Sequence, residues 1–440
     1  MANILVSEDK PTFGPKFRRN EMWTYFGPAF VASVAYIDPG NFATNIEGGS
    51  RFGYRLLWVL LWSNAMAILI QYLSAKLGIV TGLTLPQNCR KHFSRPMTLF
   101  LWVAAEVSAI ATDLAEFLGA ALGLYLLFGP AMLAHGWSRT ETLFAAALVS
   151  AVAVFLILAL DLAGYQWLER GIMAFVGVIG LCYGFEVFLV HPYWKLAAFH
   201  ALVPTLDMKN LHGSLYVAVG MLGATVMPHV VYLHSALVQP RRAELIKQPL
   251  VEGGSRRRKY LRFELIDVFV AMNGAWLINS AMIVMSAVAF AHLSNPVTTI
   301  EQAHQTLGPL LGPMAATVFA VALLCSGLSS STVGVMAGQV IIEGFLDIKF
   351  SIFLRRLITI IPAMIVIAVG LDPLKILILS QVVLSFALPF ALIPLLVLTN
   401  RASVMRSFVS ARRTRVAGWC AVGIILTLNV VLLGQMALGL

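Results

Sequence analysis

Residues 25–50 read YFGPAFVASVAYIDPGNFATNIEGGS, a stretch with the length of one membrane-spanning helix and an Asp-Pro-Gly-Asn break near its middle. Asp38 and Asn41 offer hard oxygen ligands, whereas Pro39 and Gly40 resist continuation of the helix. The carbonyl groups just before the break lose their helical partners and become additional ligands. We therefore expect a helix that is unwound inside the bilayer to hold a cation.

The same four residues also favour an extramembrane turn. The length of the apolar run argues against that alternative. The run before Asp38 would be near 20 Å long as a helix, too short for a hydrocarbon core of about 30 Å. The break is therefore expected within the span.

The composition is that of a polytopic, all-α membrane protein. Of the 440 residues, 59% are hydrophobic and only 12% are charged, which is far outside the usual range for a soluble domain. Windows of about 20 apolar residues predict eleven spans. They lie at 25–48, 56–80, 97–129, 141–161, 170–190, 214–238, 265–292, 312–338, 354–371, 374–398 and 417–437.

The net charge of +10 does not predict nucleic-acid binding, because the Lys and Arg residues mark topology instead of a surface. If residues 1–24 are a cytoplasmic segment and each window crosses once, about 25 of the 31 basic residues fall inside. We expect a multi-pass protein of the inner cell membrane with its C-terminus outside. The basic residues on the outer side are Arg51, Arg55, Arg139, Lys195, Lys209 and Lys375.

The first window shows no small-residue cleavage site, so we expect it to remain in the mature protein. The four cysteines are widely separated and lack metal-ligand spacing, so we expect them to be packing residues. The longest polar connection, at roughly 239–263, is basic and flexible in composition, and a contact with anionic lipid is an alternative to a purely topogenic role.

The sixth window is also broken, at Met227-Pro228-His229 within GSLYVAVGMLGATVMPHVVYLHSALVQ. Breaks in the first and sixth of eleven windows are the pattern of an inverted five-plus-five repeat. The first repeat would span residues 25–190 and the inverted second repeat 214–398. Residues 399–440 would add a basic loop and an eleventh helix.

Met227 precedes the helix-breaking proline of the second interrupted window. Most of the 17 methionines must be ordinary packing residues, but this one lies in the helix paired by pseudo-symmetry with the Asp38 helix. A thioether beside a carboxylate and an amide favours Mn²⁺, Fe²⁺, Co²⁺ or Cd²⁺ over Ca²⁺ and Mg²⁺.

Three acids in the third window, Glu106, Asp113 and Glu116, share one helix face. Acids at membrane depth face the protein interior and often form proton relays. The alternative, which does not exclude a relay, is a buried salt bridge with Arg355 or Arg356.

His229 and His234 follow the second break and titrate near physiological pH, which suggests a proton path. Packed or hydrogen-bonded histidines are the alternative. A membrane-embedded metalloenzyme is disfavoured, because the two histidines are five apart and the chain has no His-Glu-x-x-His motif.

With both breaks in hand, the chain resembles the natural resistance-associated macrophage proteins, the NRAMP divalent metal transporters, and is most similar to their bacterial proton-dependent manganese members. GLSSSTVGVMAGQVIIEGF at 327–345 is similar to the family's transport signature. ATDLAEFLGA at 111–120 and LSQVVLSF at 379–386 also match the family.

The resemblance implies a LeuT-like fold and a set of functional residues. It implies metal binding by the side chains of Asp38, Asn41 and Met227, with Gln381 joining in some conformations. It also implies that the backbone carbonyls of Ala35 and Ala224 are ligands. The residues that it ties to proton movement are Asp113, Glu116, His234, Arg355 and Arg356. The retained Met227 disfavours a magnesium transporter.

We expect a proton-coupled symporter, not an enzyme, that imports Mn²⁺ and also Fe²⁺ and Cd²⁺ by alternating access. Its partners would be divalent transition metal ions, protons and the lipid bilayer, with no resident cofactor, nucleic acid or protein partner indicated. Asp38 would serve both the metal and the proton. The alternative is a LeuT-fold transporter of a small organic solute, because broken helices are a general device for such substrates.

Overall fold

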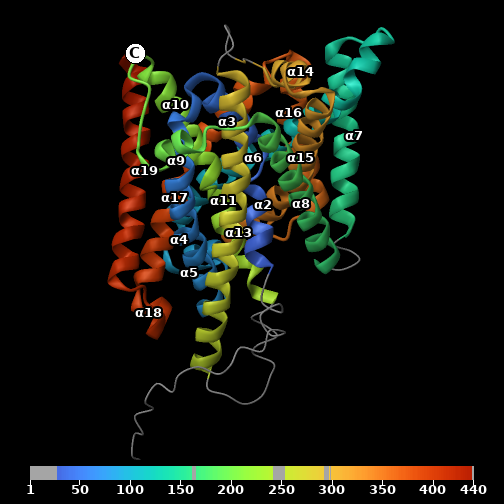
Figure 1. The fold of residues 1–440 in the computed structure, drawn as a ribbon. Coiled ribbons are helices and arrows are strands. Elements are labelled where there is room, and N and C mark those ends of the chain that lie inside the picture. Colours follow the sequence, from blue (N-terminus) through green and yellow to red (C-terminus); the bar gives the residue numbers. More distant parts are fainter. Residues whose placement is uncertain (1–26, 161–164, 241–252, 292–296, 298, 439–440) are drawn as a thin grey trace, which may run out of the picture.

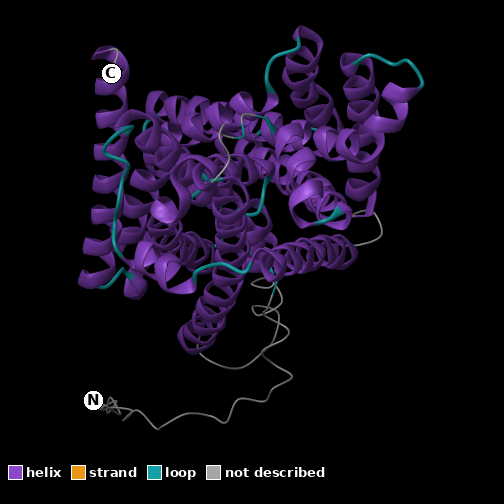
Figure 2. Ribbon diagram, turned by 45° about the horizontal axis from the view of Figure 1, so that its top comes forward, coloured by secondary structure: helices purple, strands orange, loops and turns teal. Residues whose placement is uncertain are grey.

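The protein is a bundle of helices, most of which run along one common axis (Figure 1). The computed structural model describes residues 27–160, 165–240, 253–291, 297 and 299–438, and these residues contain helices and no strand (Figure 2). The predicted all-α class is therefore confirmed. The helices are α2 (Pro28–Ala35), α3 (Pro39–Phe52), α4 (Leu57–Thr81), α5 (Leu85–His92), α6 (Arg95–Ala134), α7 (Arg139–Ala159), α8 (Tyr165–Val190), α9 (Trp194–Leu202), α10 (Leu211–Thr225), α11 (Pro228–Leu237), α13 (Gly253–Phe290), α14 (Ile300–Leu311), α15 (Pro313–Leu346), α16 (Ile352–Val369), α17 (Pro373–Asn400), α18 (Ala402–Met405) and α19 (Arg412–Leu438).

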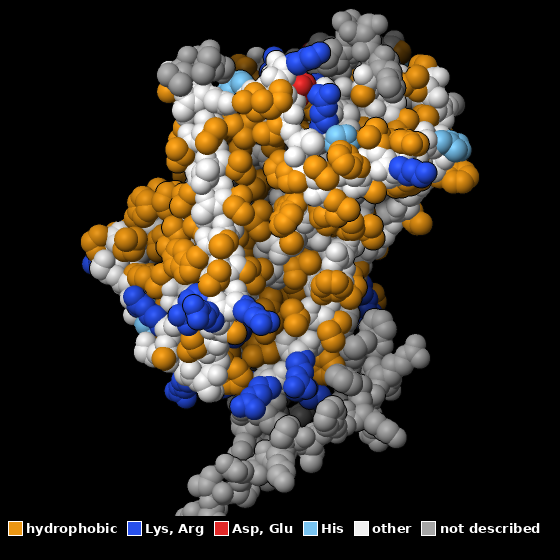
Figure 3. All heavy atoms as spheres, turned by 60° about the vertical axis from the view of Figure 1, so that its left-hand side comes forward, with side chains coloured by type: hydrophobic (Ala, Val, Ile, Leu, Met, Phe, Trp, Pro, Cys, Tyr) orange, Lys and Arg blue, Asp and Glu red, His pale blue; other side chains and the backbone are white. Residues whose placement is uncertain are grey.

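Within the described ranges, nine helical stretches are long and apolar enough to cross a membrane. All eleven predicted windows fall on helices of the bundle. The first window is divided between α2 and α3, and the ninth is α16, which has only 18 residues. Figure 3 shows a broad band of hydrophobic side chains on one face, with Lys and Arg toward its two ends. This surface is that of a multi-pass membrane protein.

The predicted polar connection at 239–263 is shorter than expected. Residues 241–252 lie outside the described part of the chain, but α13 is already helical from Gly253, well before the predicted window at 265. The hydropathy window missed this extension because Arg256, Arg257 and Arg258 are polar, although arginine is a good helix former.

Both predicted interruptions are present, and both end at a proline. α2 ends at Ala35 and α3 begins at Pro39; α10 ends at Thr225 and α11 begins at Pro228. A proline is well suited to the first position of a helix, because its fixed φ fits and its missing N–H would be unpaired there anyway. The interrupted first and sixth helices therefore have the same local cause.

The short helix α2 is held at its beginning by a side chain from α13. Gly27, at φ 130°, donates its N–H to both carboxylate oxygens of Asp267 at 3.3 and 3.2 Å, and Ala29 donates to one of them at 3.0 Å. A backbone with this φ requires glycine. Because the first N–H groups of a helix lack internal partners, a buried carboxylate stabilises the start of α2.

Glycines allow a close contact between helices α6 and α15. A Cβ at Gly123 would lie only 2.6 Å from backbone atoms of Leu324, and a Cβ at Gly327 would overlap the backbone of Ala120. Small residues on both helices allow this approach. The pair places the acidic face of α6 directly against α15.

Candidate metal-binding site

Asp38 is the N-cap of α3 and is fully buried. Its Oδ1 accepts a hydrogen bond from the Asn41 N–H at 2.9 Å, and its Oδ2 accepts from the Gly40 N–H at 3.1 Å. The helix dipole and these donors together stabilise a negative charge that is removed from water. The break therefore fixes one carboxylate in the protein interior.

The Asn41 side chain joins the two interrupted helices. Its Nδ2 donates to Asp38 Oδ1 at 2.7 Å and to the carbonyl of Ala224, at the end of α10, at 3.0 Å. Its buried Oδ1 has no hydrogen-bond partner among the described residues. Since buried polar atoms are nearly always paired, this amide oxygen is suited to a cation.

Two backbone carbonyls, one before each break, lack the N–H donor that a continuous helix would supply. In a continuous helix, Ala35 would accept from residue 39 and Ala224 from residue 228, but both positions are prolines without an N–H. The predicted freeing of carbonyl groups before each break thus has a specific origin at these two residues.

The other carbonyls of the first break are occupied. Asn279 of α13 donates to the carbonyl of Tyr36 at 2.6 Å, and Ser326 of α15 donates to that of Ile37 at 2.6 Å. Side chains from the surrounding bundle therefore satisfy the unwound backbone and leave Ala35 as the carbonyl without its helical donor.

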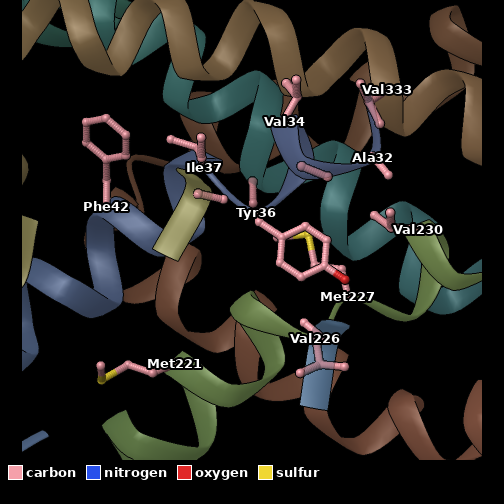
Figure 4. Packing of buried hydrophobic residues seen from close by; sticks show 14 of the residues in the cluster. Ala32, Val34, Tyr36, Ile37, Phe42, Met221, Val226, Met227, Val230 and Val333 are labelled. Atoms are coloured by element: carbon pink, nitrogen blue, oxygen red, sulfur yellow. The ribbon is translucent and has the colours of Figure 1, made fainter. Parts of the chain in front are cut away.

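Met227 is the N-cap of α11 and its side chain is fully buried. Figure 4 shows it at the start of α11, with Tyr36 of the first break drawn next to it, whereas Met221 projects elsewhere from α10. A thioether is a soft ligand that adds little for Ca²⁺ or Mg²⁺. Met227 therefore differs from the other core methionines by its position at a break.

Gln381 of α17 reaches the same carboxylate. Its Nε2 lies 3.4 Å from Asp38 Oδ2, and its buried Oε1 lacks a hydrogen-bond partner within the described structure. A Cβ at Gly40 would overlap the Gln381 amide, so glycine at this position makes the approach possible. Hydrogen bonds thus link Asp38, Asn41, Ala224 and Gln381, so the structure brings these four predicted site residues together.

The donor set is unusual for a metal site in that only one member carries a charge. Among the residues that the structure describes, no three His, Cys, Asp or Glu side chains form a group that could hold a metal. A cation at Asp38 would therefore be held mainly by neutral amide, carbonyl and thioether donors. Such a set compensates only part of a divalent charge.

The acidic face of α6 lies next to this site. Asp113 and Glu116 are fully buried, and Glu116 interacts electrostatically with both Asp113 and Asp38. A Cβ at Gly119, one turn after Glu116, would overlap the Pro39 ring, so glycine lets the first break approach α6. The two predicted sites are thereby adjacent.

Arginines of α16 lie on the far side of these acids. Arg355 and Arg356 are buried, and both interact electrostatically with Asp113. Arg355 Nη1 forms an ion pair with Glu106 Oε1 at 2.7 Å, so the predicted salt bridge exists at Glu106. Asp113 and Glu116 form no ion pair within 4.0 Å in the described structure. Unlike Glu106, they are therefore not held by a salt bridge, which leaves the predicted proton relay open to them.

Two glycines in the signature at 327–345 make room for these charges. A Cβ at Gly334 would overlap the Glu116 carboxylate and lie 2.8 Å from Asp113 Oδ1. A Cβ at Gly338 would overlap the Arg355 guanidinium. The glycine spacing of four places both positions on one face of α15.

The two histidines belong to different surroundings. His229 Nδ1 lies 3.1 Å from Thr112 Oγ1 on α6, and its Nε2 has no partner among the described residues. His234 Nδ1 lies 3.0 Å from Gln71 Oε1, and its Nε2 lies 2.9 Å from Glu264 Oε1. The structure thus brings His229 toward the acidic face of α6 but directs His234 toward α13.

Sequence reasoning missed a polar chain that runs through His234. Gln71 donates to the Tyr36 hydroxyl at 2.6 Å, so Tyr36, Gln71, His234 and Glu264 are linked from the first break to α13. Glu264 lies just before the predicted window at 265–292. The sequence signal for Glu264 was its position as an acid at the edge of an apolar run. Hydropathy alone assigns an acid at such an edge to a loop.

The chain is similar to known proteins over nearly its whole length. The family model described as "Natural resistance-associated macrophage protein-like" matches residues 29–435. The divalent metal cation transporter MntH of Deinococcus radiodurans is 49% identical over 428 residues, which cover 97% of this chain and 92% of that protein. MntH of Caldanaerobacter subterraneus is 47% identical over 409 residues, with coverages of 93% and 92%.

Solved structures give the same result for the fold. The Eremococcus coleocola manganese transporter, in complex with an aromatic bis-isothiourea substituted compound, matches with a TM-score of 0.81 and 33% identity, covering 95% of this chain and 88% of that one. The nucleobase-cation-symport-1 transporter MHP1 matches with a TM-score of 0.62 at 13% identity, over 89% and 80% of the two chains, which concerns the fold alone.

Proposed function

Because this chain belongs to the natural resistance-associated macrophage protein family and is a divalent metal cation transporter, we propose that it is a symporter that imports transition metals together with protons. Mn²⁺ is the favoured ion, and Fe²⁺ and Cd²⁺ are further substrates. The ion crosses by alternating access, with the site open to one side of the membrane at a time.

The observation that carries this proposal is the donor set around Asp38. Asp38 supplies the charge, Asn41 and Gln381 supply amide oxygens without other partners, and Met227 supplies sulfur. The carbonyls of Ala35 and Ala224 complete the set. Mixed oxygen and sulfur donors favour Mn²⁺, Fe²⁺ and Cd²⁺ over Ca²⁺ and Mg²⁺.

Proton coupling follows from the position of the acids on α6. A divalent charge beside Asp38 repels a proton from the same region, so metal arrival and proton release are electrostatically linked. The released proton would pass from Asp38 to Glu116 and Asp113, toward Arg355 and Arg356. His229 and His234 would serve as flanking proton acceptors.

We place the protein in the cell membrane, which is the inner membrane in bacteria that have two membranes. Its N-terminus would lie in the cytoplasm and its C-terminus outside. The excess of Lys and Arg on one side of the predicted spans supports this orientation. The domain limits at 190, 214 and 398 are likewise proposals, supported by the position of the two interrupted helices.

A transporter of a small organic solute was the alternative. The same fold occurs in MhsT, which was solved in complex with L-phenylalanine, but that likeness, at 13% identity, concerns the fold alone. The relatives at 45–49% identity are divalent metal cation transporters. The metal-transport reading is therefore retained and the organic solute set aside.

The test is Mn²⁺ uptake into proteoliposomes that contain a pH dye, with excess Ca²⁺ or Mg²⁺ as competitors. For the wild type, we expect Mn²⁺ entry with internal acidification and little inhibition by Ca²⁺. For Met227→Ala, we expect Mn²⁺ uptake to become sensitive to Ca²⁺, because the remaining donors are all hard oxygens.

The matched control is Met221→Ala, which removes another fully buried methionine from the preceding helix. It should retain the competitor profile of the wild type. Equal changes in both variants would assign the effect to core packing, and Mn²⁺ entry without acidification would refute proton coupling.

A further inference from the structure

Glu186 is a buried acid that the proposed transport cycle does not use. It lies on α8, four residues before the helix ends at Val190, and its side chain is fully buried. Neither carboxylate oxygen has a hydrogen-bond partner, and no basic side chain lies within 4.0 Å of it, among the described residues. An acid of this kind inside a membrane protein requires an explanation.

The surroundings of Glu186 connect it to the helix that carries Asp38. Tyr183, one turn earlier on α8, is also fully buried and its hydroxyl has no partner within the described structure. The Tyr183 ring packs edge-on against the Phe42 ring of α3, with 5.3 Å between the ring centroids. The centroids of the Phe42 ring and the Phe319 ring of α15 are 6.2 Å apart. Because Phe42 directly follows Asn41, this aromatic layer joins α8 to the metal-binding helix.

The titratable neighbours of Glu186 are all uncharged groups. On α8 they are the Tyr183 hydroxyl and the Cys182 thiol, and α15 presents the Cys325 thiol next to Cys182. The helices α13, α2 and α7 also pack against α8, and none of their described basic side chains forms an ion pair within 4.0 Å of Glu186. Within the described structure, no paired positive charge therefore compensates an ionised carboxylate at this position.

An ionised carboxylate without a counter-charge is strongly disfavoured in a dry interior, where the group takes up a proton instead. A neutral carboxylic acid is compatible with the packing around Glu186. Ionisation would require water, and we expect separation of α3 from α8 and α15, where the Phe42 ring packs against Tyr183 and Phe319, to admit it. The protonation state of Glu186 is thus tied to the packing of the aromatic layer.

We propose that Glu186 is a proton-binding site, separate from Asp113 and Glu116, that holds a proton while α3 is packed against α8 and α15 and releases it to water when this interface opens. The step adds one proton from water to the carboxylate and removes it again, with no electron transfer. The proposal rests on the proposed alternating access, since that cycle supplies the opening.

The first test measures the proton directly. Infrared difference spectra of the purified, lipid-reconstituted protein, recorded between neutral and alkaline pH, should contain the C=O stretch of a protonated carboxyl group. Glu186→Gln should remove this band, because the amide keeps the size of the neutral acid but cannot titrate. Glu169→Gln, a substitution on the same helix, is the control and should retain it.

The second test measures the consequence for transport. Glutamine imitates permanently protonated Glu186. We expect ionisation of Glu186 to slow wild-type Mn²⁺ uptake at alkaline external pH, so uptake by Glu186→Gln should decline less steeply than wild-type uptake as the external pH rises. A wild-type spectrum without a band that depends on Glu186 would overturn the proposal, even if the variant failed to fold. Mn²⁺ transport that fails in the wild type while the band is present would instead refute the proposed function alone.

Discussion

Asp38 has two roles at the scale of a single residue, because the same carboxylate caps α3 and would supply the charge of the proposed metal site. A capping side chain contributes about 1 kcal/mol to a helix. Its two oxygens already accept from Gly40, from the Asn41 backbone and from the Asn41 amide. A bound cation therefore shares an oxygen with backbone donors, which fixes the direction in which the carboxylate points.

The two roles separate in Asp38→Asn. Asparagine is as good an N-cap as aspartate, so we expect a free energy of unfolding within about 0.5 kcal/mol of the wild type. The charge is lost, however, and we expect Mn²⁺ affinity and uptake to fall by about tenfold or more. Calorimetric titration with Mn²⁺ and uptake into proteoliposomes measure the loss, and undiminished binding would move the metal site elsewhere.

The residues of the site differ in how far the sequence could predict them. Asp38, Asn41 and Met227 flank prolines inside apolar windows, so local chemistry alone indicates them. The freed carbonyls before the first break followed from its proline and glycine, but Gln381 and the choice of Ala35 and Ala224 were implied only by the family resemblance, because these roles depend on which helices meet. A hydropathy window also hides a single acid among apolar residues, and for that reason Glu186 drew no attention.

At the scale of the elements, the spacing of glycines determines how closely α15 packs against the charged side chains of α6 and α16. On α15, Gly334 and Gly338 leave the space that Glu116, Asp113 and Arg355 occupy. The signature at 327–345 therefore contributes through the absence of side chains at these two positions. Sequence reasoning recognised this stretch by resemblance and gave no physical reason for it. The reason is visible only when α6, α15 and α16 are packed together.

Gly334→Ala tests this reading of α15. The added methyl group would meet the Glu116 carboxylate, and we expect destabilisation by about 1–3 kcal/mol together with slower proton-coupled uptake. Gly177→Ala is the matched control in the interior of α8, where a Cβ meets no atom within 4 Å. Chemical denaturation and Mn²⁺ uptake compare the two variants, and equal behaviour would show that the space beside Glu116 is unimportant.

The ends of the helices were harder to predict than their existence. The interruptions followed directly from Pro39 and Pro228, which remove the N–H that a continuous helix needs. The early start of α13 was not predicted, because its sequence is basic. The short helices α5, α9 and α14 were not predicted, because they have only 8, 9 and 12 residues, too few for a window of about 20 apolar residues. Helix propensity and contacts with neighbours decide such segments.

At the scale of the whole molecule, the charge distribution predicts an orientation. Lys209 and Arg413 are both exposed, and the proposed topology places Lys209 outside and Arg413 inside. In a Cys420→Ser background, a membrane-impermeant maleimide added to intact cells should label Lys209→Cys and leave Arg413→Cys unlabelled until the membrane is permeabilised. The reverse pattern would invert the direction of every proposed pathway.

The glycine contacts between α6 and α15 also have a consequence for biogenesis. Gly123 meets Leu324, and Gly327 meets Ala120, so each contact joins residues roughly 200 positions apart in the chain. The ribosome completes α6 long before α15 exists, and during that time Asp113 and Glu116 lack the helix that covers them. A nascent chain that stalls before α15 therefore presents bare acids to the lipid, a defect that membrane quality-control proteases can detect.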